Sequence, residues 1–466
     1  MNRHPELGIS SPNDTIAAIS TPLGEAGIGI VRLSGPQAGS IALKLFRPYR
    51  QKTAALESHH LVLGQIIDPL QGEVVDEVLV SLMSAPHSYT REEVIEINCH
   101  SGYGVLSRIL QLTLEHGARL AAPGEFTQRA FLNGRIDLTQ AEAVLEVIQA
   151  RTAASLRLAA RHLSGSLGGK IRELKDRLTQ VRARVEAALD FPEDTPELPP
   201  SQVLVELEQL AAQLQALQAS YAQGRLFRQG LEVVIAGRPN VGKSSLLNRL
   251  LQEERVIVTE IPGTTRDVIE ETLSIQGLPV RLSDTAGLRQ ARDRVEELGI
   301  QRTQERLARA DLVIYLLDLS QPLDPEDEMQ LGALADRPLL LVLNKCDLLP
   351  VLTAAGLHNR WTFPIYTISA LTGQGLSELT EAIFQTAMGN AMTLNGEIVT
   401  QARHRQILGD CSKFLEQGRT ILESGQPLEL LALDLQEAAG KLAELLGEEI
   451  GEEVLDRIFA QFCLGK

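Results

Sequence analysis

The spacing of hydrophobic and polar residues changes several times along the chain. In residues 1–128, short β-branched segments at 29–33, 77–83 and 94–98 are separated by Gly and Pro, with one helical stretch near 105–116. Short strands interspersed with a helix and with turn residues are typical of a mixed sheet-and-helix domain. The pattern therefore predicts a compact α+β domain at the N-terminus.

Long helices are predicted in the next part of the chain. Residues 124 to about 189, and again 201–225, are rich in Ala, Leu, Gln and Arg at helical spacing. The segment FPEDTPELPP at 191–200 separates them, because each of its four prolines lacks a backbone donor. From 231 to 369 the order strand, Gly-rich loop, helix and strand recurs, as in a parallel α/β sheet. Helical spacing returns after about 388.

These changes predict one helical domain that is interrupted by an inserted α/β domain, because neither helical block could bury its apolar faces by itself. The predicted domains are 1–128, 129–226 for the first helical part, 227–388 for the insertion and 389–466 for the second helical part. A length of 466 residues, more than one hydrophobic core supports, agrees with several domains. With 44% hydrophobic but only 4% aromatic residues, helical packing is favoured over a β-sandwich.

Charge is unevenly distributed. The net charge of -16 disfavours a protein covered in nucleic acid. However, residues 151–184 hold nine Lys or Arg against two acids, while 429–456 hold nine acids against one Lys. Two solvated helix faces that complement each other would explain this arrangement, and so would a surface in 151–184 that contacts RNA or a partner protein.

The four cysteines have neither metal-ligand nor disulfide-framework spacing, which indicates a reducing compartment. The N-terminal residues lack the apolar segment of a signal peptide, and no aliphatic run is long enough to cross a bilayer. We therefore expect a cytoplasmic protein without a membrane partner.

A phosphate-binding loop follows the first strand of the insertion. The strand LEVVIA leads into GRPNVGKS at 237–244 and then into the helix SLLNRLL. Glycines in such a loop let backbone N–H groups approach phosphates, while Lys243 reaches the β and γ phosphates and the Ser244 hydroxyl binds Mg²⁺. The motif in this strand-loop-helix context predicts a nucleotide site.

Two further motifs in the same domain identify the nucleotide. Asp284, in DTAG at a strand end, can hold the Mg²⁺ shell through water. Asp347, in NKCD after the strand PLLLVL, can accept hydrogen bonds from the N1–H and exocyclic amine of guanine, which adenine does not offer. The order of the three motifs predicts a GTPase that binds GTP and GDP.

A switch segment is expected between the phosphate loop and DTAG. It contains IPGTTRD at 261–267, and Thr265 is predicted as the second Mg²⁺ ligand, although Pro-Gly is also an ordinary turn signal. The predicted nucleotide contacts are Asn240, Val241, Gly242, Lys243, Ser244, Ser245, Thr259, Glu260, Ile261, Pro262, Gly263, Thr264, Thr265, Asp284, Thr285, Ala286, Gly287, Asn344, Lys345, Asp347, Ser369 and Ala370.

Leu288 follows DTAG, at the position where Ras-like enzymes carry the glutamine that orients water. Because leucine cannot hydrogen-bond water, either hydrolysis is very slow or another group replaces the glutamine. Acidic candidates are Asp293, Glu296 and Glu297.

The motif set resembles the translation-factor-like GTPases that carry a hydrophobic residue in place of the catalytic glutamine. Outside the insertion, the chain contains DTIAAISTP, GIGIVRLSG, PHSYTREEVIEINCHSG, APGEFTQRAFLNGRIDLTQAEAV and a terminal FCLGK. With these segments, the whole chain closely resembles the bacterial MnmE (TrmE) family of tRNA modification GTPases. The resemblance implies a homodimer that acts with a flavin-containing MnmG (GidA)-like partner on the wobble uridine of certain tRNAs, adding an aminomethyl-type group at C5.

The resemblance also implies a site for formyltetrahydrofolate, the source of the one-carbon unit. The matching residues are Arg32, Glu96, Arg135 and Lys466. Arginines suit the carboxylates of the glutamate tail, and a carboxylate suits the donor edge of the pterin. Cys463, near Lys466, is either a nucleophile of the uridine chemistry or a small buried residue.

The same resemblance accounts for Leu288, because members of the family bind potassium beside the phosphates when two GTPase domains meet. The matching positions for K⁺ are Asn240, Thr259, Ile261 and Thr264, and Glu296 matches the acid that positions the attacking water. We expect Glu296, Asp284 and Lys243 to serve catalysis.

Two other functions fit part of the sequence. A ribosome-assembly GTPase switch would share the nucleotide motifs, but should carry a basic RNA-binding module where this chain has an acidic C-terminal block. A dynamin-like membrane scaffold would need a hydrophobic paddle or a lipidation motif, and neither is found in the sequence.

Overall fold

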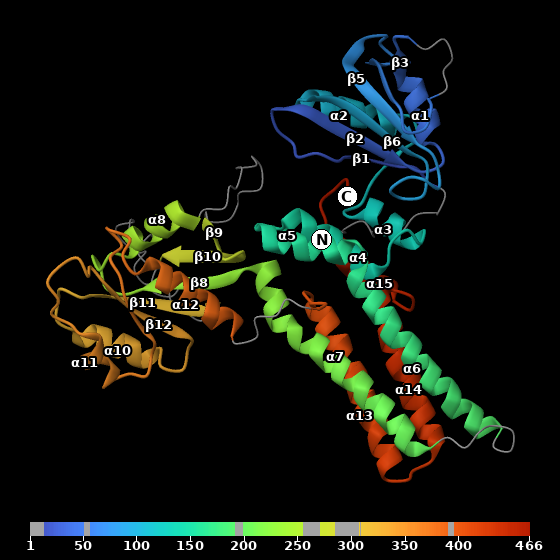
Figure 1. Cartoon of the computed structure of the whole chain (residues 1–466). Helices are drawn as coiled ribbons and strands as arrows, with labels where there is room; N and C mark the ends of the chain where they lie inside the picture. The colour runs from blue at the N-terminus through green and yellow to red at the C-terminus, as the bar shows by residue number, and fades with distance from the viewer. Residues whose placement is uncertain are drawn as a thin grey trace, which may run out of the picture. The chain divides into compact units, whose positions relative to one another are not determined.

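The computed structural model describes residues 14–50, 56–191, 199–254, 271–284, 307, 309–389 and 396–466 (Figure 1). The described residues divide into two compact units. One unit comprises the described residues up to Leu145 together with 443–466, and the other comprises those from Glu146 to Leu442. Each unit is considered separately below.

The first unit is built on a seven-stranded sheet with the order β3-β4-β5-β6-β2-β1-β7. All neighbouring strands are antiparallel except β1 and β7. The strands are β1 Ile16–Ile19, β2 Ala26–Ser34, β3 Phe46–Pro48, β4 Leu61–Ile67, β5 Val74–Met83, β6 Val94–Ser101 and β7 Arg119–Leu120. Helices α1 (Ala38–Leu45) and α2 (Tyr103–Glu115) bury their apolar residues against one face of this sheet.

The other face of that sheet meets α3 (Glu125–Leu132), whose Phe126 packs with Ile16 and Ala18 of β1. The C-terminal helix α15 (Glu452–Phe459) packs with the first half of α4 (Leu138–Gln149) through an apolar cluster that includes Phe459 and Phe462. The end of the chain is thereby held in the same unit as its beginning.

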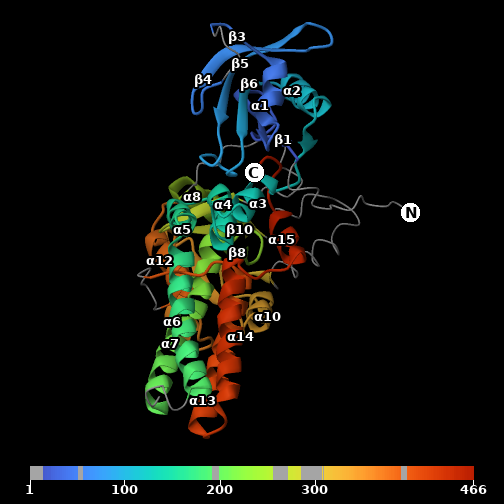
Figure 2. The same cartoon turned by 90° about the vertical axis from the view of Figure 1, so that its right-hand side faces the viewer.

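Four long helices form a bundle: α6 Ser166–Asp190, α7 Pro200–Gln229, α13 Ala402–Glu423 and α14 Leu428–Leu446. In α6 the buried residues Leu167, Ile171, Leu174 and Leu178 recur at intervals of three or four, which gives one apolar face per helix. Figures 1 and 2 both show α7 and α13 side by side although they come from distant parts of the sequence. The helix α5 (Ala153–Leu163) precedes the bundle.

The inserted domain has a six-stranded sheet with the order β13-β12-β11-β8-β10-β9. All strands are parallel except β9, and they are β8 Leu231–Ala236, β9 Glu271–Ile275, β10 Leu278–Asp284, β11 Leu312–Asp318, β12 Leu339–Asn344 and β13 Ile365–Thr367. Helices α8 (Lys243–Glu254) and α12 (Leu376–Met388) cover one face. Helices α10 (Pro325–Ala333) and α11 (Ala354–His358) cover the other.

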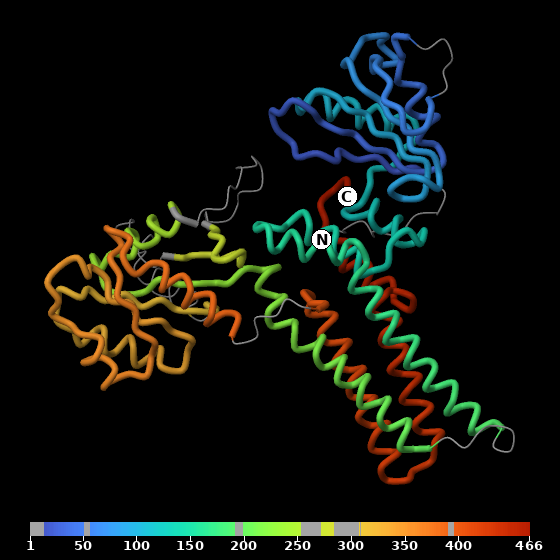
Figure 3. The backbone as a smooth tube through the Cα atoms, in the orientation of Figure 1, coloured from blue at the N-terminus to red at the C-terminus, as the bar shows by residue number. Residues whose placement is uncertain are grey.

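The predicted fold class is confirmed: an N-terminal α+β domain, a helical domain and an inserted α/β domain. The colours of Figure 3 show that the insertion, drawn from yellow-green to orange, follows the green helix α7 and precedes the orange-red helix α13 in chain order. One expectation is wrong, since residues 124–189 form four helices of which only α6 is long. Turns at Gly134 and Gly165, both with positive φ, interrupt the helical spacing there. The domain boundaries themselves stay predictions.

Among the helices of the described ranges, none combines the length and the apolar character that a membrane crossing requires.

Candidate functional site

The phosphate loop connects β8 to α8 at the carboxyl edge of the inserted sheet. A Cβ atom on Gly237 would lie 2.4 Å from the carbonyl oxygen of Leu316, so only glycine allows the loop to pass this close to β11. Asn240 and Gly242 also have positive φ. The ammonium of Lys243 donates to the carbonyl oxygens of Gly237 at 2.8 Å and Arg238 at 2.7 Å, which places it inside the loop. Ser244 and Ser245 are exposed on the first turn of α8.

Asn344 brings three of the predicted nucleotide segments together. It ends β12, is 2% exposed, and donates from Nδ2 to the carbonyl oxygen of Val241 at 2.8 Å. Its Oδ1 accepts from the backbone N–H of Ala370 at 2.9 Å. A single buried side chain thus joins the phosphate loop, NKCD and the segment of Ser369 and Ala370.

The residues around NKCD, which are predicted to bind the guanine base, are held in place by contacts among themselves. Lys345 adopts a positive φ and its ammonium lies 2.6 Å from Asp318 Oδ2 at the end of β11. Burial raises the pKa of Asp318, but hydrogen bonds from Lys345 and Ser320 outweigh it and hold that pKa below its ordinary value. Asp347 follows these residues and is exposed, so its carboxylate can be reached by a guanine base.

The remaining nucleotide predictions cannot be compared with side-chain positions. Asp284 ends β10 opposite Ile235 of β8, and only its backbone is described. The positions outside the described ranges are Thr259, Glu260, Ile261, Pro262, Gly263, Thr264, Thr265, Thr285, Ala286, Gly287, Leu288, Asp293, Glu296 and Glu297. Their roles stay predictions.

A second polar site lies on the α3 face of the N-terminal sheet. Arg32 of β2 is paired in register with Glu96 of β6, and both alternate with core residues, so they project away from α1 and α2. Arg32 lies 2.8 Å (Nε) and 2.7 Å (Nη2) from the same oxygen of Glu96. The guanidinium also stands over the Phe126 ring, 5.7 Å from its centre.

The C-terminal tail closes this second site. Arg32 Nη1 donates to the carbonyl oxygen of Gly465 at 3.2 Å, and the Phe126 N–H donates to that of Lys466 at 3.2 Å. Gly465 has φ of 84°, and a Cβ there would lie 2.4 Å from the carbonyl oxygen of Ile19. The tail therefore needs glycine at this position to lie against β1. Three of the four predicted folate residues, Arg32, Glu96 and Lys466, are brought together.

The fourth predicted folate residue, Arg135, contacts Tyr89 instead. Its guanidinium stacks 4.7 Å from the centre of the Tyr89 ring and donates to the Tyr89 carbonyl oxygen at 3.1 Å. The Tyr89 hydroxyl lies 3.0 Å from Thr127 Oγ1 on α3, the helix that carries Phe126. Cys463 is exposed, so the alternative of a small buried cysteine is wrong, while its role as a nucleophile stays a prediction.

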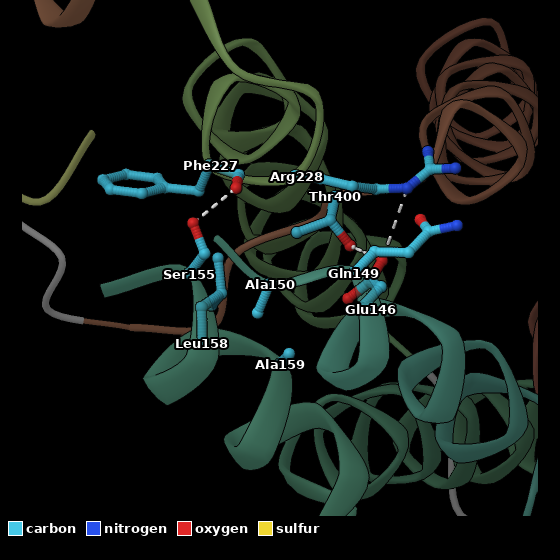
Figure 4. A pocket seen from close by; sticks show the side chains of 9 residues that line it. All are labelled: Glu146, Gln149, Ala150, Ser155, Leu158, Ala159, Phe227, Arg228 and Thr400. Atoms are coloured by element: carbon cyan, nitrogen blue, oxygen red, sulfur yellow. Dashed lines mark hydrogen bonds and ion pairs between the residues drawn. The ribbon is translucent and has the colours of Figure 1, made fainter. Parts of the chain in front are cut away.

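A buried carboxylate marks the place where the chain enters and leaves the inserted domain. Glu146 is 7% exposed and lines a pocket of about 10 Å³ with Arg228, Thr400 and residues of α5 (Figure 4). It accepts from Thr400 Oγ1 at 2.6 Å and from Gln401 Nε2 at 2.7 Å, and lies 3.2 Å from His162 Nδ1. The volume suits a single water rather than a substrate.

The sequence analysis missed Phe126, Asp318 and Glu146. Asp318 carries a usable signal, since a charged residue at the carboxyl end of an otherwise hydrophobic strand of a parallel sheet lies at its ligand-binding edge. Phe126 and Glu146 carry no such local signal, because their partners lie far away in the sequence.

Known proteins resemble the chain over nearly its whole length. A model described as "GTP-binding protein TrmE N-terminus" matches residues 15–135, and one described as "MnmE helical domain" matches 138–463. A "tRNA modification GTPase MnmE" of Moorella thermoacetica is 49% identical over 97% of this chain and 100% of the relative. A protein of the same name from Chloroflexus aurantiacus is 48% identical, again over 97% and 100%.

Proposed function

Since the chain belongs to the MnmE (TrmE) family and is a GTP-hydrolysing enzyme, we propose that it couples GTP hydrolysis to the modification of tRNA in the cytoplasm. The modification is an aminomethyl-type group, such as carboxymethylaminomethyl, at C5 of the wobble uridine. The observation that supports the proposal is that one chain holds both a phosphate loop joined to NKCD through Asn344 and an Arg32–Glu96 pair contacted by the C-terminal tail. A homodimer and an MnmG (GidA)-like flavoprotein complete the proposed assembly.

In the proposed nucleotide site, Lys243 pairs with the β and γ phosphates and Asp347 accepts from the guanine N–H groups. The exposed hydroxyl of Ser244, on the first turn of α8, suits a hard cation. Ser244 and Thr265 would hold Mg²⁺, which supplies positive charge to the phosphates when bound. Asp284, at the end of β10, would hold the water shell of that ion.

Hydrolysis is proposed to depend on potassium and on the meeting of two GTPase domains. The exposed Asn240, held at φ of 65°, offers an amide oxygen beside the phosphates, and Thr259, Ile261 and Thr264 would complete the K⁺ site. Glu296 would position water in place of the glutamine that Leu288 replaces. Glu296→Ala should then slow hydrolysis with little loss of GTP binding. Equal turnover by the variant and the parent in potassium would remove Glu296 from the mechanism.

The second site is proposed to bind a formyltetrahydrofolate-type folate. Arg32 and Arg135 are suited to the carboxylates of its glutamate tail, Glu96 to donors of the pterin, and Lys466 to a further anionic group. Phe126 and Tyr89 offer aromatic faces beside the two guanidinium groups. When bound, the folate would supply the one-carbon unit, while these residues bind and orient it.

Nucleoside mass spectrometry of bulk tRNA tests the proposal. Cells that lack this protein should lose aminomethyl-type wobble uridines, and the intact gene but not Asp284→Ala should restore them. An unchanged nucleoside profile would leave a GTPase without a tRNA role and would favour the ribosome-assembly switch instead. Ribosome profiles on sucrose gradients from the same cells would then show accumulated subunit precursors.

A further inference from the structure

Ion pairs, one of them with a buried carboxylate, connect the phosphate loop to a neighbouring helix. Asp327 of α10 is 1% exposed, and its Oδ2 lies 2.9 Å from Nε of Arg238. Asp324, the N-cap of the same helix, lies 2.8 Å from Nη1 of Arg238. Because Arg238 directly follows Gly237 in the loop, one guanidinium joins the phosphate loop to α10.

Asp327 is in turn contacted by a residue of the sheet. The hydroxyl of Tyr315, a fully buried residue of β11, lies 3.0 Å from Asp327 Oδ1 and 3.0 Å from Gln330 Oε1. Burial and the negative charge of Asp327 raise the pKa of Tyr315, so its hydroxyl stays protonated and can donate. A buried carboxylate needs polar partners of this kind to offset its loss of hydration. Asp327 is therefore held between Tyr315 of the sheet and Arg238 of the phosphate loop.

The backbone of Arg238 also contacts Lys243, the lysine predicted to serve catalysis. Its carbonyl oxygen accepts from the Lys243 ammonium at 2.7 Å, beside the acceptor on Gly237. The Arg238 side chain is 27% exposed, so its ion pairs with Asp324 and Asp327, and not burial alone, set the position of its guanidinium. A loop that must present several backbone N–H groups to phosphates gains affinity when it is held in that shape beforehand.

We infer that Asp327 is a positioning residue for the GTPase reaction, which acts through Arg238 to hold the phosphate loop and Lys243 in the arrangement that receives the phosphates. The inference rests on nucleotide binding at this loop. If Asp327 acts in this way, its substitution should weaken binding of the nucleotide phosphates and leave the selection of the guanine base unchanged. The reason is that the contacts described for Asp327 lead to the phosphate loop and not to NKCD.

The experiment measures dissociation of N-methylanthraniloyl-GDP from the full chain by stopped-flow fluorescence. Asp327→Asn preserves the volume but removes the charge, and we expect about tenfold faster dissociation, with a matching rise in KM for GTP. Arg238→Gln should have the same effect. The double variant should lose little more than either single one, because both changes break the same link. The preference for GDP over ADP should stay at the parental value.

A matched control removes an Arg–Asp contact from the other end of the same sheet. Asp311 lies 2.7 Å from Nη2 of Arg225 and accepts from the Glu232 N–H at 3.0 Å, just before β11 begins. Asp311→Asn should lower the melting temperature while dissociation of the nucleotide keeps the parental rate.

Three results would overturn the inference: a parental dissociation rate in Asp327→Asn, additive effects in the double variant, or an equal effect of Asp311→Asn. If Asp327→Asn does not fold, Arg238→Gln decides alone, since its side chain is partly exposed and a parental rate would refute the link. A parent protein that fails to bind the labelled GDP would refute the nucleotide site itself, which is a different outcome from any of these.

Discussion

Replacing Glu146 by Ala tests whether one buried carboxylate holds the helical domain together where the insertion begins and ends. The side chain of Glu146 is 6% exposed and accepts from Thr400, Gln401 and His162. A hydrogen bond to a charged group contributes about 1.5–3 kcal/mol. The contacts share one carboxylate and are therefore not additive. The Arg228 guanidinium, whose Nε lies 3.9 Å from Glu146 Oε1, would also lose its counter-charge, and removal of one partner of a buried ion pair costs about 3–5 kcal/mol. We therefore expect Glu146→Ala to lose about 3–5 kcal/mol of unfolding free energy.

The assay is urea unfolding of the full chain followed by two signals. Far-UV circular dichroism reports mainly the long helices, whereas fluorescence of Trp361, the single tryptophan, reports the inserted domain, where it packs near α11. Glu146→Ala should move the circular dichroism transition to lower urea and leave the tryptophan transition nearly unchanged.

Glu397 provides the matched control, because it lies in the segment before α13 that also carries Thr400 and Gln401, two partners of Glu146. It accepts from Arg161 at 2.9 Å and from Ser166 at 2.8 Å, but 19% of its side chain is exposed. Solvent screens such a pair, so Glu397→Ala should cost about 1 kcal/mol or less. An equal shift in the two variants, or a loss below about 1 kcal/mol in Glu146→Ala, would show that the buried carboxylate does not hold the junction.

Other predictions address the two ligand sites and the thiols. Asp347→Asn should reduce the preference for GTP over ATP in a fluorescence titration, because one acceptor becomes a donor that faces guanine donors. Arg32→Ala should weaken binding of 5-formyltetrahydrofolate about tenfold in calorimetry and leave GTP affinity unchanged. Iodoacetamide at neutral pH should label exposed Cys463 first in intact-mass spectra, since burial raises the pKa of Cys99 to about 11 and that of Cys411 to about 12.

Controls for these predictions come from the same chain. An unchanged GTP-to-ATP preference in Asp347→Asn would refute its place in the base pocket. Arg47→Ala, on the exposed side of β3, should leave folate binding as it is, and a loss equal to that of Arg32→Ala would contradict the site. Cys463→Ser should abolish the first label, and equally fast labelling of Cys99 or Cys411 in the native protein would contradict the burial argument.

Local sequence was enough to predict the fold class and the nucleotide motifs. A strand followed by a Gly-rich loop and a helix is specified by neighbouring residues, and the parallel sheet then places the strand ends at one edge. The helix lengths in 124–189 were predicted less well, because glycines at 134 and 165 interrupt a pattern that remains helical on both sides. The folate residues were predicted only through resemblance to a family.

By itself, the sequence determined the phosphate loop, the position of the aspartate that is predicted to select guanine, and the alternation of helical and α/β segments, since each depends on residues close together in the chain. Only the tertiary structure decided which distant groups meet. Arg32 contacts Gly465, 433 residues away, and Glu146 binds Thr400, 254 residues away. Asp327 contacts Arg238 because α10 packs against the sheet next to the phosphate loop. A charged side chain is compatible with solvent and with a buried ion pair alike, and its burial is set by packing that no short stretch of sequence contains.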